Sequence, residues 1–223
     1  GQKQSQEEKE NRGLEEKEKG DKITQAFIFQ PNISVKRTVT SIDWSPKVGE
    51  LLMVSYSKCS EYRYDEPDGL VNIFSTNLKK DLDYNDLLNE VTKAIFNPHS
   101  PSLVIGSTQS GYIVQWNFKD KDPNSKITPD QKSTLAKDGH KSAIYALAIV
   151  GNKNAHNIVS SQMTRRFANG ISVAFEPEDE FPFIQPAAER AENEQTMIRV
   201  NTMEFPEDDT DKFYIGSEDY NIY

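Results

Sequence analysis

Histidine, cysteine and carboxylate side chains are the groups in this sequence that could bind a metal ion or act as nucleophiles. The three histidines are His99, His140 and His156. No two of them have the spacing of zinc ligands, and the sequence contains no H-E-x-x-H motif. Cys59 is the only cysteine, and no neighbour is placed to activate its thiol. We therefore predict no metal ligand and no catalytic residue in this set.

Two acidic runs, 176–180 and 207–209, could attract divalent cations weakly. Their spacing matches no calcium-binding loop, so a solvated acidic surface is the expected role. The motifs G-x-x-x-x-G-K-[ST], G-x-S-x-G and G-x-G-x-x-G do not occur. The sequence thus predicts no cofactor and no enzyme activity.

Composition restricts the partners of the chain. It has 223 residues and a net charge of −9, so phosphate backbones repel it and we expect no nucleic-acid partner. No run approaches the roughly 20 apolar residues that span a bilayer, so we expect no membrane insertion. A single cysteine and no apolar leader favour a reducing, intracellular compartment. The first residue is Gly1, which indicates a cut or processed amino end.

Two segments precede the regular part of the sequence. Residues 1–22 are mostly Glu, Lys and Gln and cannot bury enough surface to fold, which predicts a disordered charged tail. A solvated linker is the expected role, and partner binding is the alternative. Residues 23–38 are apolar and interrupted by Pro31, which predicts an extended arm or an edge strand.

From Val39 to the end, an apolar pattern occurs four times. Each copy has an apolar residue, a second one three positions later and a third five positions later. The copies are Val39/Ile42/Trp44, Val91/Ala94/Phe96, Ile144/Leu147/Ile149 and Val200/Met203/Phe205. Their first residues lie 52, 53 and 56 positions apart, as expected of a repeated supersecondary unit.

Further strands follow in each unit. The second predicted strand ends on a small residue, at Ser55, Gly106, Ser160 and Gly216. Turns at 68–69, 110–111, 169–170 and 218–219 precede third strands at 70–74, 112–116, 171–175 and 220–223. Outer fourth strands should lie within 78–90 and 119–137. Residues 176–195 are predicted to be an exposed acidic insertion, with 181–184 as an outer strand or an anchor.

A repeated sheet that cannot cover both of its own faces must stack against its neighbours, which is the logic of a β-propeller blade. We therefore predict an all-β, partial propeller over 39–223, with units that start near 39, 91, 144 and 200 and a last blade that is incomplete. We expect a fragment of a longer chain, with apolar blade faces exposed. Trp44, Phe96, Trp116 and Phe175 recur in register, so they are predicted core residues.

Several stretches resemble one known family. Gly139-His140 lies four residues before Ile144, as does the Gly-His element of a WD40 repeat, whose histidine joins a hydrogen-bond network. The chain is similar to the cytoplasmic dynein intermediate chain, a WD40-repeat subunit. The stretches that carry the similarity are VTSIDWSPKVGELLMVSYS (39–57), DEPDGLVNIF (65–74), LVIGSTQSGYIVQWN (103–117), VGNKNAHNIVSS (150–161), FYIGSEDYNIY (213–223) and LEEKEKGD (14–21).

The resemblance implies a non-catalytic scaffold that binds the dynein heavy chain and links it to cargo adaptors and light chains. It also implies a cytoplasmic location on microtubules, and contacts with light chains and dynactin through regions largely outside this chain. The third unit departs from the pattern, with Asn169-Gly170 and Phe175 in place of Asp-Gly and Trp, and Trp116 is followed by Asn117. An axonemal dynein intermediate chain and a generic WD40 scaffold are the alternatives.

Overall fold

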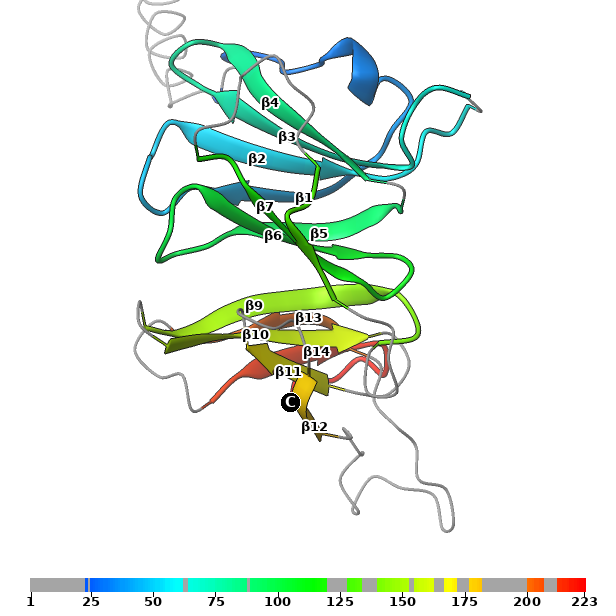
Figure 1. Ribbon diagram of the computed structural model, residues 1–223, viewed down its shortest axis with the longest axis vertical. Coiled ribbons are helices and arrows are strands. Elements are labelled where there is room, and N and C mark those ends of the chain that lie inside the picture. Colours follow the sequence, from blue (N-terminus) through cyan, green and yellow to red (C-terminus); the bar gives the residue numbers. More distant parts are fainter. Residues whose placement is uncertain are drawn as a thin grey trace, which may run out of the picture.

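Four antiparallel β-sheets stack side by side in the computed structural model (Figure 1). The structure describes residues 23, 25–61, 64–87, 89–119, 128–133, 140–152, 155–162, 167–171, 177–181, 200–206 and 212–223. In these ranges the single helical segment is a 3₁₀ turn, η1, at Asn32–Ser34. The predicted charged tail at 1–22 lies outside the described residues.

The first two sheets each have four strands in sequence order. Blade 1 consists of β1 (Val39–Trp44), β2 (Leu51–Tyr56), β3 (Gly69–Ser75) and β4 (Lys80–Leu87). Blade 2 consists of β5 (Val91–Phe96), β6 (Leu103–Thr108), β7 (Ile113–Asn117) and β8 (Gln131–Lys132). The outer strands β4 and β8 lie within the two segments where outer strands were expected.

The third and fourth sheets repeat the same order. Blade 3 consists of β9 (Ile144–Asn152), β10 (Ala155–Gln162), β11 (Phe167–Ile171) and β12 (Pro177–Phe181). Blade 4 consists of β13 (Val200–Glu204) and β14 (Tyr214–Ser217), and Ile222 forms a bridge to Gly216. The prediction of an all-β, partial WD40-type propeller is confirmed. The described strands form an arc of blades and not a closed ring.

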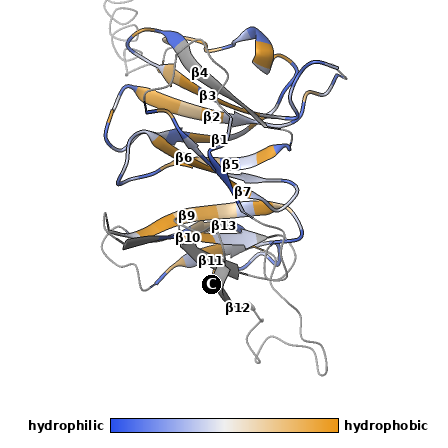
Figure 2. Cartoon of the chain, in the orientation of Figure 1, coloured by the Kyte–Doolittle hydropathy of each residue, from blue (hydrophilic) through white to orange (hydrophobic). Residues whose placement is uncertain are grey.

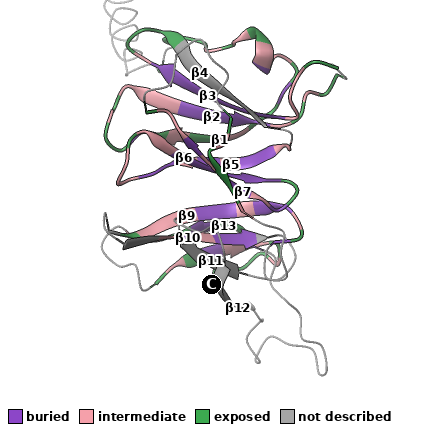
Figure 3. Ribbon diagram, in the orientation of Figure 1, coloured by how far each residue is buried: buried purple, intermediate pink, exposed green. Residues whose placement is uncertain are grey.

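Alternation along each strand gives every blade two apolar faces. The forward face points to the next blade and the rear face to the preceding one. Three clusters fill the junctions: Met53, Val71 and Ile73 against Val91, Ala94 and Phe96; Ile105 and Ile113 against Ile144 and Leu147; and Ala146 against Val200, Met203 and Ile215. Figures 2 and 3 show that the hydrophobic strands of blades 1 to 3 are largely the buried ones.

One glycine permits close packing inside blade 2. A Cβ atom at Gly106 would lie 2.6 Å from Cζ3 of Trp116, a distance that real contacts do not reach. Trp116 and Phe96 are buried, as predicted. The small residue at position 106 therefore makes room for the largest side chain of the blade core.

Trp44 does not belong to the core, contrary to the prediction. Its side chain is 53% exposed, although Phe96 at the same position of blade 2 is buried. Trp44 lies on the rear face of blade 1, and no other blade covers that part of the face among the described residues. Phe175, the fourth predicted core aromatic, lies outside the described residues.

The register corrects the predicted alignment of the second strands. The residues that pair with the third position of each first strand are Ser55, Ser107, Ser161 and Gly216. Gly106 and Ser160, predicted to be equivalent to Ser55, are therefore one residue out of step. Ser107 lies 16 positions after Val91, as Ser55 does after Val39, so the repeat spacing itself identifies Ser107. Ser161 lies 17 positions after Ile144 because the connection between β9 and β10 is one residue longer than that between β1 and β2.

The predicted turn at Asn169-Gly170 is also wrong. Both residues belong to β11, where they pair with Val159 and Ile158 of β10. Strand β10 continues past Ser160 to Gln162, so the chain returns earlier than the Asn-Gly pair suggested. The acidic segment supplies the outer strand β12, which begins at Pro177 and ends at Phe181. The remainder of the predicted third strand (172–175), and 182–195 of the insertion, lie outside the described residues.

Candidate interaction surface

The inner strands β1, β5, β9 and β13 line a concavity of about 630 Å³ on the axis of the arc. Each blade contributes its first strand, so the wall combines side chains that are far apart in sequence. Aromatic and proline residues, among them Trp44, Phe96 and Phe205, lie beside charged groups in this wall. A concave surface with apolar walls and a few polar groups is a common form of binding site in proteins.

Three charged side chains from three blades face this concavity: Asp43, Lys93 and Glu204. Asp43 is half-buried, and one of its carboxylate oxygens accepts a hydrogen bond from the backbone N–H of Phe96 at 2.7 Å. Burial raises the pKa of Asp43, and the hydrogen bond from Phe96 and the nearby Lys93 oppose this shift. Burial lowers the pKa of Lys93, against the attraction of Glu204 and Asp43. These three side chains can therefore offer a hydrogen-bond donor and hydrogen-bond acceptors to a partner.

The histidines do not form a common site. His99 lines the rim of the concavity, whereas His140 is buried in blade 3, where its Nε2 lies 2.7 Å from Oγ of Ser160. That contact agrees with the hydrogen-bond role expected for His140. His156 lies on β10 and its side chain is not described. The part of the chain that the structure describes contains no group of three or more His, Cys, Asp or Glu residues that could hold a metal ion.

Cys59 lies half-buried in the loop after β2, with Sγ 3.8 Å from the carbonyl oxygen of Val35. The acidic run at 207–209 lies outside the described residues, and the side chains of 177–180 are not described either. No helix in the described ranges is long and apolar enough to cross a membrane.

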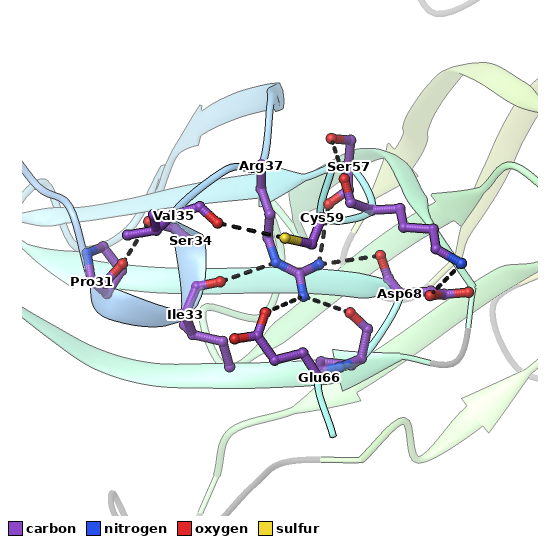
Figure 4. A network of polar contacts seen from close by, with 11 residues as sticks. Pro31, Ile33, Ser34, Val35, Arg37, Ser57, Cys59, Glu66 and Asp68 are labelled. Carbon is purple, nitrogen blue, oxygen red and sulfur yellow. Dashed lines mark hydrogen bonds and ion pairs between the residues drawn. The ribbon is translucent and has the colours of Figure 1, made fainter. Parts of the chain in front are cut away.

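Arg37, which was not predicted from the sequence, is the centre of a network of polar contacts (Figure 4). Its buried guanidinium donates to five acceptors: the carbonyl oxygens of Ile33 (3.0 Å), Ser57 (3.2 Å), Pro67 (2.6 Å) and Asp68 (3.3 Å), and Oε2 of Glu66 (3.3 Å). These bonds connect the segment before β1 to the loop between β2 and β3. The acceptor-rich Glu66-Pro67-Asp68 turn was visible in the sequence, but no local pattern connects it to Arg37, which lies 29 to 31 positions earlier.

Hydroxyl groups form a second set of contacts that the sequence did not reveal. Oγ of Ser41 accepts from the N–H of Ala94 at 2.9 Å, so it bonds blade 1 to blade 2. In blade 2, the hydroxyls of Thr92 and Ser107 both donate to the carbonyl oxygen of Ile144, the first residue of blade 3. These bonds satisfy backbone groups at the inner edge strands, which no neighbouring strand pairs.

Comparison with known proteins finds a relative that matches most of this chain. The chain is 31% identical over 199 residues to the cytoplasmic dynein 1 intermediate chain of Drosophila melanogaster. The match covers 88% of this chain but 28% of the fly protein, so the chain spans less than a third of that relative's length. No protein-family profile matches the sequence.

Among solved structures, the crystal structure of the computationally designed Ika4 protein superposes with a TM-score of 0.57 at 14% sequence identity. The superposition covers 91% of this chain and 97% of the designed chain, so it supports the fold alone. The repeated blades and the sequence match agree with the resemblance noted from the sequence. Over most of its own length, the chain is dynein intermediate chain-like.

Proposed function

We propose that the chain is a non-catalytic subunit of a dynein motor complex, in which its blades bind the heavy chain. The observation that supports this function is the 31% identity to a cytoplasmic dynein intermediate chain across 88% of the chain. In the whole protein, the same subunit links the motor to cargo adaptors and light chains, and regions largely outside this chain contact light chains and dynactin. Its location is the cytoplasm, on microtubules.

A stack of sheets suits this role because its loops and inner strands present fixed positions to a partner. The concavity adds charge selectivity: Asp43, Lys93 and Glu204 come from three different blades and keep their relative positions only while the blades stay packed. Glu204 is exposed, so it can contact a partner without distorting the blade. Binding by surface complementarity requires no chemistry from these groups.

The test is affinity capture of the tagged chain from cells that contain dynein, followed by identification of the captured proteins. Recovery of a cytoplasmic dynein heavy chain supports the proposal, and Glu204→Lys should reduce that recovery several-fold. Glu61→Lys is the matched control, because Glu61 is an exposed carboxylate that pairs with Lys36 near the arm.

Two results contradict the assignment in different ways. Capture of an axonemal heavy chain, with the tagged protein in cilia, indicates the axonemal class. Capture of a stable assembly without any dynein heavy chain indicates a generic WD40 scaffold. Equal recovery with Glu204→Lys and with the control overturns the role of the concavity while leaving the complex membership intact.

A further inference from the structure

The sequence joins a serine or threonine to a following proline at three places: Ser45-Pro46, Ser100-Pro101 and Thr128-Pro129. A hydroxyl residue followed by proline is the substrate pattern of proline-directed protein kinases, which transfer phosphate from ATP. The kinase must bring the hydroxyl against its catalytic aspartate, so the side chain has to be accessible and its segment has to fit an extended groove. The tertiary structure therefore decides which of the three dipeptides can react.

Ser45 is not accessible to an enzyme, because its side chain is buried at 4% exposure. Its Oγ accepts a hydrogen bond from the N–H of Val48 at 3.1 Å. Its own N–H donates to the carbonyl oxygen of Leu51 at 3.0 Å. Ser45 thus holds the turn between β1 and β2, and phosphorylation here would require this end of blade 1 to unfold locally.

Ser100 is half-buried in the corresponding turn of blade 2, between β5 and β6. Its N–H donates to Oδ1 of Asn97 at 3.2 Å, and its carbonyl oxygen accepts from the N–H of Leu103 at 3.1 Å. Asn97 is itself buried. The turn is therefore fixed on both sides of Ser100, and the segment becomes extended only if these bonds are lost.

Thr128 differs from both serines, because it is exposed and lies outside the strands, shortly before β8. Pro129 disfavours a helical backbone at Thr128 and favours the extended form that a kinase binds. Among the described residues, the backbone bonds of this segment to β7 begin at Asp130, whose N–H donates to the carbonyl oxygen of Gln115 at 2.9 Å. Thr128 can therefore enter the groove of an enzyme while these bonds stay intact.

The segment after Thr128 forms the outer edge of blade 2. Strand β8 is two residues long, and it pairs with β7. Two flanking bonds close this short strand: Oδ2 of Asp130 accepts from the N–H of Asn117 at 2.6 Å, and the N–H of Ser133 donates to the carbonyl oxygen of Ile113 at 2.8 Å. An edge strand with so short a ladder depends on these flanking bonds.

A phosphate on Thr128 would act on one of these flanking bonds. It adds about −1.5 to −2 charge at pH 7, two positions before the Asp130 carboxylate. Like charges at this separation repel each other, and the phosphate oxygens also compete for the N–H of Asn117 that Asp130 holds. Phosphorylation at this position therefore weakens the attachment of β8 to β7.

We propose that Thr128 is a phosphorylation site for a proline-directed protein kinase, and that its phosphate loosens the outer strand β8 of blade 2. In the reaction, Oγ1 of Thr128 attacks the γ-phosphorus of ATP and forms a new O–P bond. The bond between that phosphorus and the β,γ-bridging oxygen breaks, ADP leaves, and the hydroxyl proton passes to the aspartate of the kinase. Accessibility and strand bonding carry this proposal, which is independent of the dynein assignment.

The experiment treats the purified chain with Mg²⁺-ATP and, separately, with a mitogen-activated protein kinase and a cyclin-dependent kinase, which are both proline-directed. Mass spectrometry locates the phosphate and gives its rate of incorporation. Thr128 should react at least about tenfold faster than Ser45 or Ser100, because the two serines react only after local opening. Thr128→Ser should keep the site and Thr128→Ala should remove it, whereas Ser100→Ala should leave the total incorporation unchanged.

Short synthetic peptides that contain each of the three dipeptides are the control for the preferences of the kinases themselves. The rate in the folded chain, divided by the rate in the matching peptide, should be at least about tenfold higher for Thr128 than for either serine. No phosphate on Thr128 with either kinase overturns the proposal. Equal corrected rates at Thr128 and at a serine overturn it as well, because the fold then makes no selection.

Hydrogen exchange measured by mass spectrometry tests the effect on β8. Phosphorylation of Thr128 should accelerate amide exchange in 113–117 and 130–133 about threefold or more, because the bonds of Asp130 weaken. Strand β2, which lies in blade 1, is the internal control and should exchange at the same rate with and without phosphate. Unchanged exchange in 113–117 and 130–133 of the phosphorylated chain overturns the proposed loosening of β8.

Discussion

The two faces of blade 1 are covered in different ways. The forward face is packed against another sheet, with Met53, Val71 and Ile73 in the cluster that it shares with blade 2. The rear face is packed by the segment before β1 (25–38, here called the arm), which contains η1 and no strand, and in which the ring of Phe29 lies 4.8 Å from the ring of Phe74. The arm is fixed by the polar network around Arg37, whereas the forward face is fixed by apolar packing and by the bonds of Ser41 and Asp43.

This difference shows that the neighbouring element decides which side chains of a blade are buried. Both faces of β2 and β3 carry large apolar residues, so the strand sequence alone does not distinguish them. A complete sheet covers its neighbour through its first strand, but the arm, a segment of a few residues, covers only the middle strands β2 and β3. The rear of β1 is consequently open, and Trp44 is exposed where its counterpart Phe96 is buried.

The largest effect should come from removal of the arm's anchor. Arg37→Ala leaves four backbone carbonyls and Glu66 without their donor in a buried site, so we expect a loss of about 3–5 kcal/mol in the free energy of unfolding. Chemical denaturation with a fluorescence readout measures it. Lys58→Ala breaks an exposed pair with Asp68 and should cost less than about 1 kcal/mol. Equal losses in the two variants would show that the arm adds no stability.

Truncation of a side chain on the forward face tests the packing of blade 1 against blade 2. Met53→Ala creates a cavity in the junction with blade 2, and we expect a loss of about 2–4 kcal/mol in the free energy of unfolding. Leu78→Ala removes a similar volume from an exposed turn and should change it by less than about 0.5 kcal/mol. The same denaturation series measures both. A small effect of Met53→Ala would mean that the blades pack loosely at this junction.

A buried amide distinguishes the rear face further. Asn72 lies between Leu70 and Phe74 on the rear side of β3, and neither polar atom of its side chain has a partner among the described residues. Valine occupies the equivalent position of blade 2, Val114. Asn72→Val should therefore raise the free energy of unfolding by about 1–2 kcal/mol.

Asn97 is the matched control for this change. It is equally buried, but its Oδ1 accepts from the N–H groups of His99 and Ser100. Asn97→Val should destabilise the protein by a similar amount, because two turn donors lose their acceptor. Melting temperatures that move in opposite directions support the contrast. If both variants melt at lower temperatures than the wild type, Asn72 has a role in the rear face that its contacts do not show.

The smallest effect concerns the pH dependence at the forward junction. Burial raises the pKa of Asp43 in the folded state, so the folded protein binds a proton more tightly than the unfolded chain. Stability contributed by this group is therefore present below the ordinary carboxyl pKa and is lost as the pH rises through the folded pKa.

Asp43→Asn keeps an oxygen acceptor for Phe96 and removes this titration. Its stability relative to wild type should increase as the pH rises from acid toward neutral, measured by thermal unfolding across a pH series. Lys93→Met is the comparison variant. Because burial lowers the pKa of Lys93, the titration of this group changes stability in the alkaline range and not between acid and neutral pH. A constant difference between Asp43→Asn and wild type would contradict the burial of this carboxylate.

Much of the fold followed from local patterns. The four copies of the first-strand pattern correspond to strands that begin at Val39, Val91, Ile144 and Val200, because a strand with one apolar side has a strong sequence period. Trp116 and Phe96 were predictable core residues for the same reason. The turn at Gly111, with φ of +83°, was predictable because only glycine adopts that backbone easily.

The candidate site was less accessible to sequence reasoning. Arg37 reaches acceptors 20 to 31 positions away, and no periodicity connects them. Asp43, Lys93 and Glu204 meet in the concavity because three blades bring their first strands together. Ser107 was identifiable from the repeat spacing, but Ser161 was not, because the connection between β9 and β10 is one residue longer than in blade 1.

The sequence by itself determined the blade: its strands, its apolar alternation, its glycines and its family resemblance are local properties of the chain. Only the tertiary structure decided which of the repeated apolar positions are buried. Burial requires a neighbouring surface, and the neighbour of each face is another blade, an arm or solvent. Trp44 and Phe96 have the same place in the repeat and different surroundings, because contacts between distant segments form only when the blades are assembled.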